Sequence, residues 1–215
     1  MSNVVRLSRI HYPVTTLGPG RRIGIWFQGC SIRCAGCISV DTWRTDGPVV
    51  SVDAVLRLIT DAVQNADGIT ITGGEPFDQP GGLRALLAGM RPLLRIDADV
   101  LVFSGYPKER IEEVLDSCSG LIDALISDPF EISTTQTLAL RGSDNQRLTV
   151  LTSRGRRFLT YERKRTQADD ALDAMVDPDG SVWMAGIPNR GDLQRLRQSL
   201  AAEGTRIWTS EQHVC

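Results

Sequence analysis

The sequence has 215 residues, of which 41% are hydrophobic and 23% are charged, and its formal net charge is −2. This composition is typical of a globular protein, and the near-neutral charge argues against a general nucleic-acid binder, which carries a basic excess. No apolar run approaches the roughly 20 residues that span a bilayer, and residues 1–6 lack the charged-then-apolar order of a signal peptide. We therefore expect a cytoplasmic protein that acts on neither nucleic acid nor membrane.

Strand-like and helix-like segments alternate through residues 22–127. Short apolar runs predict four strands, at residues 22–28, 69–72, 100–103 and 124–127. Helices are expected between them, at residues 51–66 with Ser51 as the cap, at 83–94, and at 107–117 with Pro107 in the first turn. The alternation predicts parallel βαβ units, too few for a complete eight-fold barrel. The expected fold is therefore α/β, an open partial barrel.

The remaining third of the chain is less regular. Residues 148–152 and 157–161 predict the two arms of a hairpin around Arg154 and Gly155. A strand is expected at 181–186 after an Asp-Pro-Asp-Gly turn, followed by a helix at 191–203 and a last strand at 206–208. We expect a single domain over residues 1–215, with a core at about 17–150 and a short C-terminal β/α extension at about 151–215.

Three of the five cysteines, Cys30, Cys34 and Cys37, lie within eight residues directly after the first predicted strand. Cytoplasmic thiols stay reduced, so a disulfide framework is not expected. Three thiolates on one short loop can instead converge on a soft metal centre. On a four-iron cluster, three ligands would leave one iron open to a substrate or cofactor. Three buried cysteines beside a turn remain the alternative.

A structural zinc site is the other alternative for this loop. Zinc usually takes four ligands, commonly as two separated pairs. No second pair exists, because Cys118 and Cys215 are isolated and the two histidines, His11 and His213, have no ligand spacing. Cys118 shares helical spacing with apolar residues, which favours a structural role, and Cys215 is the terminal residue. The pattern therefore favours an iron–sulfur cluster.

The C-x3-C-x2-C spacing after the first strand resembles the radical S-adenosylmethionine (SAM) superfamily, whose fold is a partial (β/α)6-type TIM barrel. The resemblance implies that Cys30, Cys34 and Cys37 hold a catalytic [4Fe-4S] cluster and that SAM chelates the fourth iron. Gly36 stands where the family usually has an aromatic residue. The subgroup that activates anaerobic ribonucleotide reductase is similar in carrying glycine there.

A Gly73-Gly74-Glu75-Pro76 turn follows the second predicted strand. Without a Cβ, a glycine pair lets a ligand approach the backbone closely, and Glu75 offers an acceptor to an ammonium group. The turn resembles the family's GGEP motif, which implies that Gly73, Gly74 and Glu75 contact the methionyl amine of SAM. Simple chain reversal is the alternative.

Two further polar residues follow predicted strands, at the edge where α/β proteins bind ligands. The resemblance places Ser104 near the ribose or carboxylate of SAM and makes Asp128 a second candidate contact, although an aspartate before proline also forms ordinary turns. Residues 141–146, Arg-Gly-Ser-Asp-Asn-Gln, resemble another element of the activating subgroup, with a surface turn as the alternative. Residues around the cysteines, at 28–29 and 41–43, also resemble that subgroup.

The resemblance implies an oxidoreductase that reductively cleaves SAM to a 5′-deoxyadenosyl radical. A reducing protein such as flavodoxin or ferredoxin would donate the electron to this enzyme. Activation of a glycyl radical enzyme is the expected function. Modification of a peptide or small-molecule substrate, with the segment after about residue 150 as the specificity element, is the alternative. A non-enzymatic iron–sulfur electron carrier or a zinc-stabilised binding module represents another class. Six of the 24 basic residues lie at 154–165, either as a solvated face or as a docking patch for an acidic partner.

Overall fold

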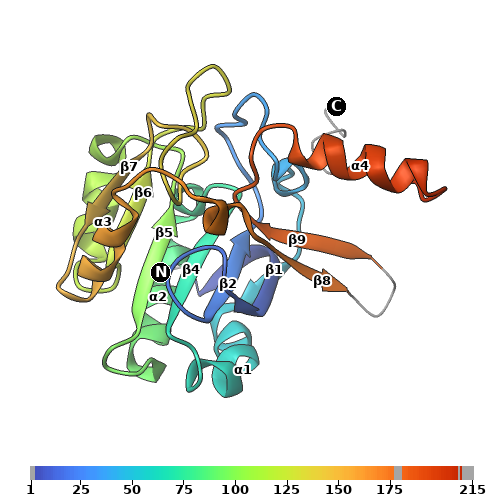
Figure 1. Ribbon diagram of the computed structural model, residues 1–215. Coiled ribbons are helices and arrows are strands. Elements are labelled where there is room, and N and C mark those ends of the chain that lie inside the picture. Colours follow the sequence, from blue (N-terminus) through green and yellow to red (C-terminus); the bar gives the residue numbers. More distant parts are fainter. Residues whose placement is uncertain (1–2, 177–180, 208, 210–215) are drawn as a thin grey trace.

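The computed structural model describes residues 3–176, 181–207 and 209. A seven-stranded mixed sheet has the order β3-β1-β2-β4-β5-β6-β7, and a separate two-stranded hairpin is formed by β8 and β9 (Figure 1). The strands are β1 (Val4–Val14), β2 (Arg22–Phe27), β3 (Val49–Ser51), β4 (Gly68–Gly73), β5 (Asp99–Phe103), β6 (Ala124–Ser127), β7 (Arg147–Val150), β8 (Leu172–Val176) and β9 (Val182–Gly186). The α-helices are α1 (Val52–Val63), α2 (Pro80–Met90), α3 (Glu112–Ser117) and α4 (Asp192–Ala202).

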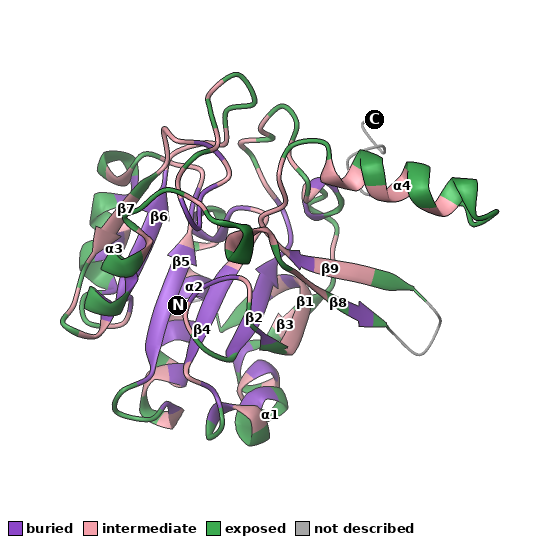
Figure 2. Cartoon of the chain, viewed as in Figure 1, coloured by how far each residue is buried: buried purple, intermediate pink, exposed green. Residues whose placement is uncertain are grey.

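The four expected strands are confirmed as β2, β4, β5 and β6, which pair in parallel. The helices α1, α2 and α3 connect them and cover one face of the sheet, where Ile25, Ile71 and Val102 pack. The Ser51 hydroxyl accepts a hydrogen bond from the Ala54 amide at 3.2 Å and so caps α1 as expected. The parallel strands are buried on both faces, as strands of this kind usually are (Figure 2).

The second face of the sheet is covered by the chain after residue 139. Trp26 of β2 packs with Met175 and Ala185 of the hairpin, and Ile126 of β6 packs with Phe158. In a closed barrel this face would be the interior. Here the C-terminal extension fills part of it, and the rest remains open as a cavity.

The α/β class is confirmed, whereas the partial (β/α)6 barrel is not. Of the described strands, four run parallel, and the antiparallel strands β1 and β7 flank them. The sequence patterns did not predict β1, β3 or β8. β1 is the longest of the three, and its residues are mostly half-buried without a strict alternation, which leaves no clear period-two signal.

The expected hairpin at 148–152 and 157–161 is wrong. Residues 147–150 form β7, which pairs with β6, and residues 157–161 belong to the 3₁₀ helix Arg154–Tyr161. β6 offers an open sheet edge, and all four residues of β7 pair with it, so this segment joins the existing sheet instead of forming a local hairpin. Gly155 then packs so tightly that an added Cβ would lie 1.9 Å from the Asp123 carbonyl oxygen.

Two of the other elements expected in the C-terminal third are confirmed. The strand at 181–186 and the helix at 191–203 are confirmed as β9 and α4. The Asp-Pro-Asp-Gly turn at 177–180 lies outside the described residues. Arg206 and Ile207 are not in a strand, and Trp208 lies outside the described residues. None of the described helices is long and apolar enough to cross a membrane.

Candidate active site

The cysteine loop leaves the carboxyl end of β2 and is closed at its base. The buried side chain of Gln28 donates hydrogen bonds to the carbonyl oxygens of Asp41, at 3.1 Å, and Arg44, at 2.9 Å. The Gly29 amide donates to the Thr42 carbonyl at 2.8 Å. The residues at 28–29 and 41–43 that resembled the activating subgroup therefore hold the two ends of this loop together.

Inside the loop, the backbone turns sharply between the cysteines. Arg33 and Gly36 have φ angles of +51° and +77°, and the Cys37 amide donates to the Cys34 carbonyl at 3.1 Å. An added Cβ at Gly36 would lie 2.5 Å from Cδ1 of Ile132. Both the left-handed backbone and the contact with Ile132 favour glycine over the family's usual aromatic residue.

A second set of contacts ties the loop to the neighbouring strands. Ser31 donates its amide to the Asp78 carboxylate at 2.8 Å and its hydroxyl at 3.0 Å. The Tyr106 hydroxyl donates to the same carboxylate at 2.7 Å and lies 2.6 Å from the Ser31 hydroxyl. The loop is thereby fixed to the segments that follow β4 and β5.

The glycine pair brings the turn after β4 against the cysteine loop. Gly74 donates its amide to the Phe27 carbonyl, and Glu75 donates its amide to the Gly29 carbonyl, both at 2.8 Å. Gly73 has a φ of +103°, and an added Cβ at Gly74 would lie 2.1 Å from the Gly29 oxygen. The glycine pair is thus required for a close approach between this turn and the cysteine loop of the same chain.

Glu75 is a buried carboxylate with donors but no cation. It accepts hydrogen bonds from the Ser104 hydroxyl at 3.0 Å, the Gly105 amide at 2.8 Å and the Phe77 amide at 3.0 Å. None of the described lysines or arginines forms an ion pair with it. Burial raises the pKa of Glu75 to about 7, despite the three donors. Ser104 therefore acts on Glu75, in addition to lining the cavity.

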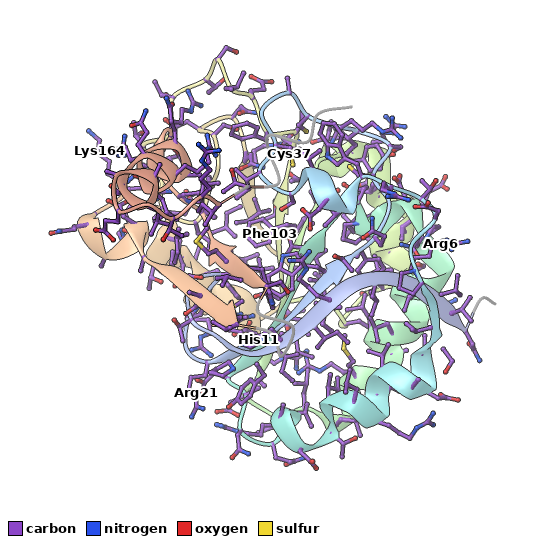
Figure 3. All side chains as sticks on the ribbon, turned by 90° about the vertical axis from the view of Figure 1, so that its right-hand side faces the viewer. Arg6, His11, Arg21, Cys37, Phe103 and Lys164 are labelled. Atoms are coloured by element: carbon purple, nitrogen blue, oxygen red, sulfur yellow. The ribbon has the colours of Figure 1, made fainter. Side chains whose placement is uncertain are left out.

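One cavity of about 480 Å³ joins these groups. All three cysteines line it, together with Gly73, Gly74, Glu75 and Ser104. Figure 3 shows Cys37 beyond the end of β5, where Phe103 lies, and both residues line the cavity. Sequence reasoning missed much of the remaining wall, which includes Trp26, Ile32, Phe130, Ile132, Met184, Ile187 and Leu193. These apolar residues had no spacing that distinguishes a cavity wall from a core.

The chemistry of this wall fits an iron–sulfur cluster. The buried indole N–H of Trp43 lies beside the Cys37 thiol, and a hydrogen bond from it favours the thiolate form that would bind iron. Burial raises the pKa of the Cys30, Cys34 and Cys37 thiols, which coordination to a metal would reverse. Within the described part of the chain, no three Cys, His, Asp or Glu side chains converge on one ion. A cluster binds each thiolate to a different iron.

Asp128 is the predicted site residue that does not line this cavity. It has a φ of +83°, and its carboxylate accepts hydrogen bonds from Arg147 at 2.7 and 3.1 Å. Arg147 also pairs with Glu109 at 2.8 Å. Asp128 therefore belongs to an ion-pair group beside the cavity.

The 141–146 motif mainly holds the loop after β6. Ser143 accepts from the Glu131 amide at 3.0 Å, and Gln146 donates to the Asp128 carbonyl at 3.1 Å. Gly142 and Gln146 reach the cavity, whereas Arg141 is buried beside Glu162. The motif is thus neither a simple surface turn nor a row of cavity side chains.

The residues that sequence reasoning discounted have structural partners or fall outside the described chain. Cys118 is buried in the helix-side core, as expected, and the His11 ring makes an edge-to-face contact with Trp183 at 5.2 Å. Cys215 and His213 lie outside the described residues. Four of the six basic residues at 154–165 pair with acids, namely Arg154 with Asp123, Arg157 with Asp99, Arg163 with Asp169 and Arg165 with Asp170.

The site thus combines a three-cysteine loop, a glycine-paired turn and an uncompensated carboxylate around one cavity at the carboxyl edge of a parallel sheet. Ligands of α/β proteins bind at this edge. This arrangement defines an iron–sulfur protein with room for a second ligand beside its cluster.

The chain belongs to the family described as the 4Fe-4S single cluster domain, whose model matches residues 16–149, more than half of the sequence. It is 28% identical over 138 residues to the anaerobic ribonucleoside-triphosphate reductase-activating protein of Enterobacteria phage T4, covering 61% of this chain and 85% of that protein. The protein of the same description from Escherichia coli (strain K12) is 29% identical over 147 residues, covering 63% and 93%.

A third relative is the pyruvate formate-lyase-activating enzyme of Staphylococcus aureus (strain USA300), 36% identical over 83 residues, which cover 36% of this chain and 33% of that enzyme. These similarities confirm the resemblance to the activating enzymes of the radical SAM superfamily. They imply a [4Fe-4S] cluster and SAM as the cofactors. The C-terminal extension lies beyond the family model.

Proposed function

We propose that this protein is a radical SAM enzyme that activates a glycyl radical enzyme. The observation that carries the proposal is the meeting of Cys30, Cys34 and Cys37 with the turn at Glu75 around a single cavity. The cysteines would hold three irons of a [4Fe-4S] cluster. When bound, the reduced cluster and SAM supply a 5′-deoxyadenosyl radical that abstracts a hydrogen atom.

The chain's own groups prepare the second ligand's position. The Glu75 carboxylate lies in the turn after β4 and accepts three hydrogen bonds, but it has no cation as a partner. An ammonium group of SAM would supply the missing positive charge and favour the ionised form. Ser104 orients this carboxylate, and the cavity wall beside it is mainly apolar. Asp128, which pairs with Arg147, would influence the site only through the loop that it anchors.

The relatives' names support a glycyl radical enzyme as the partner and substrate. A reducing protein such as flavodoxin or ferredoxin would supply the electron, and the reducing cytoplasm is the compartment that a three-thiol site favours. We further propose that the open sheet is a shortened form of the partial (β/α)6 barrel, within one domain of residues 1–215. The shared cavity supports this, because both the core and the extension line it.

The test is anaerobic reconstitution with iron and sulfide, followed by reduction and addition of SAM. We expect formation of methionine and 5′-deoxyadenosine, and, with the partner enzyme present, a glycyl doublet in the EPR spectrum. A protein that assembles the cluster but leaves SAM intact is an electron carrier, and the proposal would be wrong. Zinc bound in place of iron after anaerobic purification would point to a binding module.

A second candidate function is modification of a peptide or small molecule. It is favoured by one observation, that residues 184–191, 193, 194 and 197 of the extension line the cavity although they lie beyond the family model. In that case SAM cleavage would accompany a change in the mass of the substrate, with no stable glycyl radical on a large partner.

A further inference from the structure

The extension contributes a strand to the cavity wall. Met184, Ala185 and Gly186 of β9 line the cavity, whereas no described residue of β8 does. β9 therefore lies between the cavity and β8, on the side of the hairpin nearer to the cysteine loop and α4 (Figure 1). The wall continues through residues 187–191 to the start of α4.

β9 pairs with β8 along one edge only. Among the described strands, none pairs with its second edge. Its sequence, Val-Trp-Met-Ala-Gly, contains neither a charged residue nor proline. Proteins usually protect free strand edges with lysine, proline or a covering segment, because unpaired N–H and C=O groups recruit another strand. This edge lacks the first two protections.

The edge is also held rigidly in place. The Asp173 carboxylate of β8 accepts hydrogen bonds from the amides of Thr15, at 2.6 Å, and Thr16, at 3.1 Å. Trp183 of β9 makes edge-to-face ring contacts at 5.2 Å with Trp26 and with His11. These contacts tie the hairpin to the main sheet and preorganise β9 for binding.

The chain after β9 is fastened in the same way. Arg165 donates to the Ile187 carbonyl at 2.7 Å, and Gln136 donates to the Pro188 carbonyl at 3.0 Å. The wall that begins at β9 therefore keeps its position relative to the loop that covers Gly36. A ligand seated on it would lie in the cavity that the cysteines share.

We propose that the free edge of β9 binds an extended, glycine-containing segment of the partner protein as an added strand. The proposal rests on the proposed function and specifies how that substrate is held. A row of backbone donors and acceptors recognises a polypeptide, which repeats the same groups, far better than a compact metabolite. The side chains that line the cavity are mainly apolar. Glu75 is the one acidic side chain among the described lining residues.

Strand addition has a signature that other binding modes lack. Successive residues of an added strand direct their N–H groups alternately toward and away from the neighbouring strand. Methylation of a peptide nitrogen on the facing side removes a hydrogen bond and adds a clash. Methylation of the next nitrogen does neither. Sensitivity to N-methylation therefore repeats every two residues.

The test uses the reconstituted full-length protein with SAM and short capped peptides of serine, threonine and valine around one central glycine. One N-methyl group is placed at each position in turn, and binding is followed by tryptophan fluorescence. We expect alternate positions to weaken binding by about fivefold or more, with the intervening positions close to the parent peptide. A deuterated central glycine should transfer deuterium to 5′-deoxyadenosine with the same alternation.

A matched pair of variants locates the edge. Val176 and Val182 face each other across the hairpin and are both exposed. Val182→Lys, on β9, should favour peptides with glutamate over lysine at the flanking positions, because charges on neighbouring strands interact. Val176→Lys, on β8, should show no such preference.

Uniform sensitivity to N-methylation, no measurable peptide binding, or equal preferences in the two lysine variants would overturn the proposal. Failure of the proposed function would look different. In that case, the reconstituted protein would not cleave SAM even without peptide, a measurement that does not depend on β9.

Discussion

Buried carboxylates occupy both edges of the parallel sheet, but their surroundings differ. At the amino edge, Asp99 and Arg22 are both fully buried and form an ion pair at 2.6 Å. Arg157 lies 3.2 Å from the second oxygen of Asp99. At the carboxyl edge, Glu75 is equally buried, yet it has only neutral donors.

The presence or absence of a cationic partner distinguishes a carboxylate that serves the fold from one that is available to a ligand. Asp99 is compensated within the fold, and the guanidinium of Arg22 also donates to Thr70 and to the Ile69 carbonyl. Burial raises the pKa of both carboxyls, but Arg22 and Arg157 oppose the rise at Asp99, whereas no cation opposes it at Glu75, whose pKa reaches about 7. Burying a carboxylate without a cation is costly, so such a site is retained where a ligand supplies the charge.

The largest expected effect concerns the cysteine loop beside Glu75. Cys34→Ala should abolish the brown absorbance of the reconstituted cluster and SAM cleavage, because two thiolates remain for three irons. Cys118→Ala is the matched control, since this thiol is buried in the helix-side core. Absorbance spectra and 5′-deoxyadenosine yield measure both. An active Cys34→Ala protein would contradict the assignment.

At the amino edge of the sheet, breaking the buried ion pair should lower the free energy of unfolding. Arg22→Met leaves Asp99 buried with a more distant cation, and we expect a loss of about 3–5 kcal/mol in the free energy of unfolding. Asp46→Asn breaks an exposed pair with Arg44 and should leave the free energy of unfolding nearly unchanged. Urea titrations compare the two. Equal losses would remove the distinction between buried and exposed pairs.

At the carboxyl edge, Glu75→Gln should weaken SAM binding by about tenfold to a hundredfold, the usual contribution of a hydrogen bond to a charged group. The amide keeps the size and one acceptor of the carboxylate, so cluster absorbance should persist. Anaerobic calorimetry measures the affinity. Unchanged binding would mean that Glu75 serves the fold in the manner of Asp99.

The acidity of Glu75 predicts a pH dependence of opposite sign for binding and folding. SAM affinity should rise with pH up to about 7, by at most about tenfold per unit, as the carboxylate ionises. Without ligand, the free energy of unfolding should fall from about pH 4.5 to 7, because the folded state binds the proton more tightly. Glu75→Gln should flatten both profiles.

The smallest effect is expected at Asp128. Its partner Arg147 keeps a second carboxylate, Glu109, and the group is partly exposed. Asp128→Asn should therefore change SAM affinity by less than about threefold. A loss of SAM affinity as large as that expected for Glu75→Gln would mean that Asp128 contacts SAM directly.

Local patterns predicted the elements close to the site. Apolar runs identified the parallel strands, Ser51 marked the start of α1, and the spacing of Cys30, Cys34 and Cys37 indicated a cluster. Each depends on residues within one turn or one strand, where backbone preference and side-chain periodicity act directly. The hairpin at 148–161 failed because a distant strand, β6, competed for the same segment.

The sequence by itself indicated three cysteines as cluster ligands and predicted the alternation of β2, β4, β5 and β6 with the helices α1, α2 and α3. Only the tertiary structure decided that Ser104 donates to Glu75, that Asp128 pairs with Arg147, and that β9 completes the cavity. These contacts join residues that are far apart in the chain. Their existence depends on how the sheet and the extension pack, which no local pattern encodes.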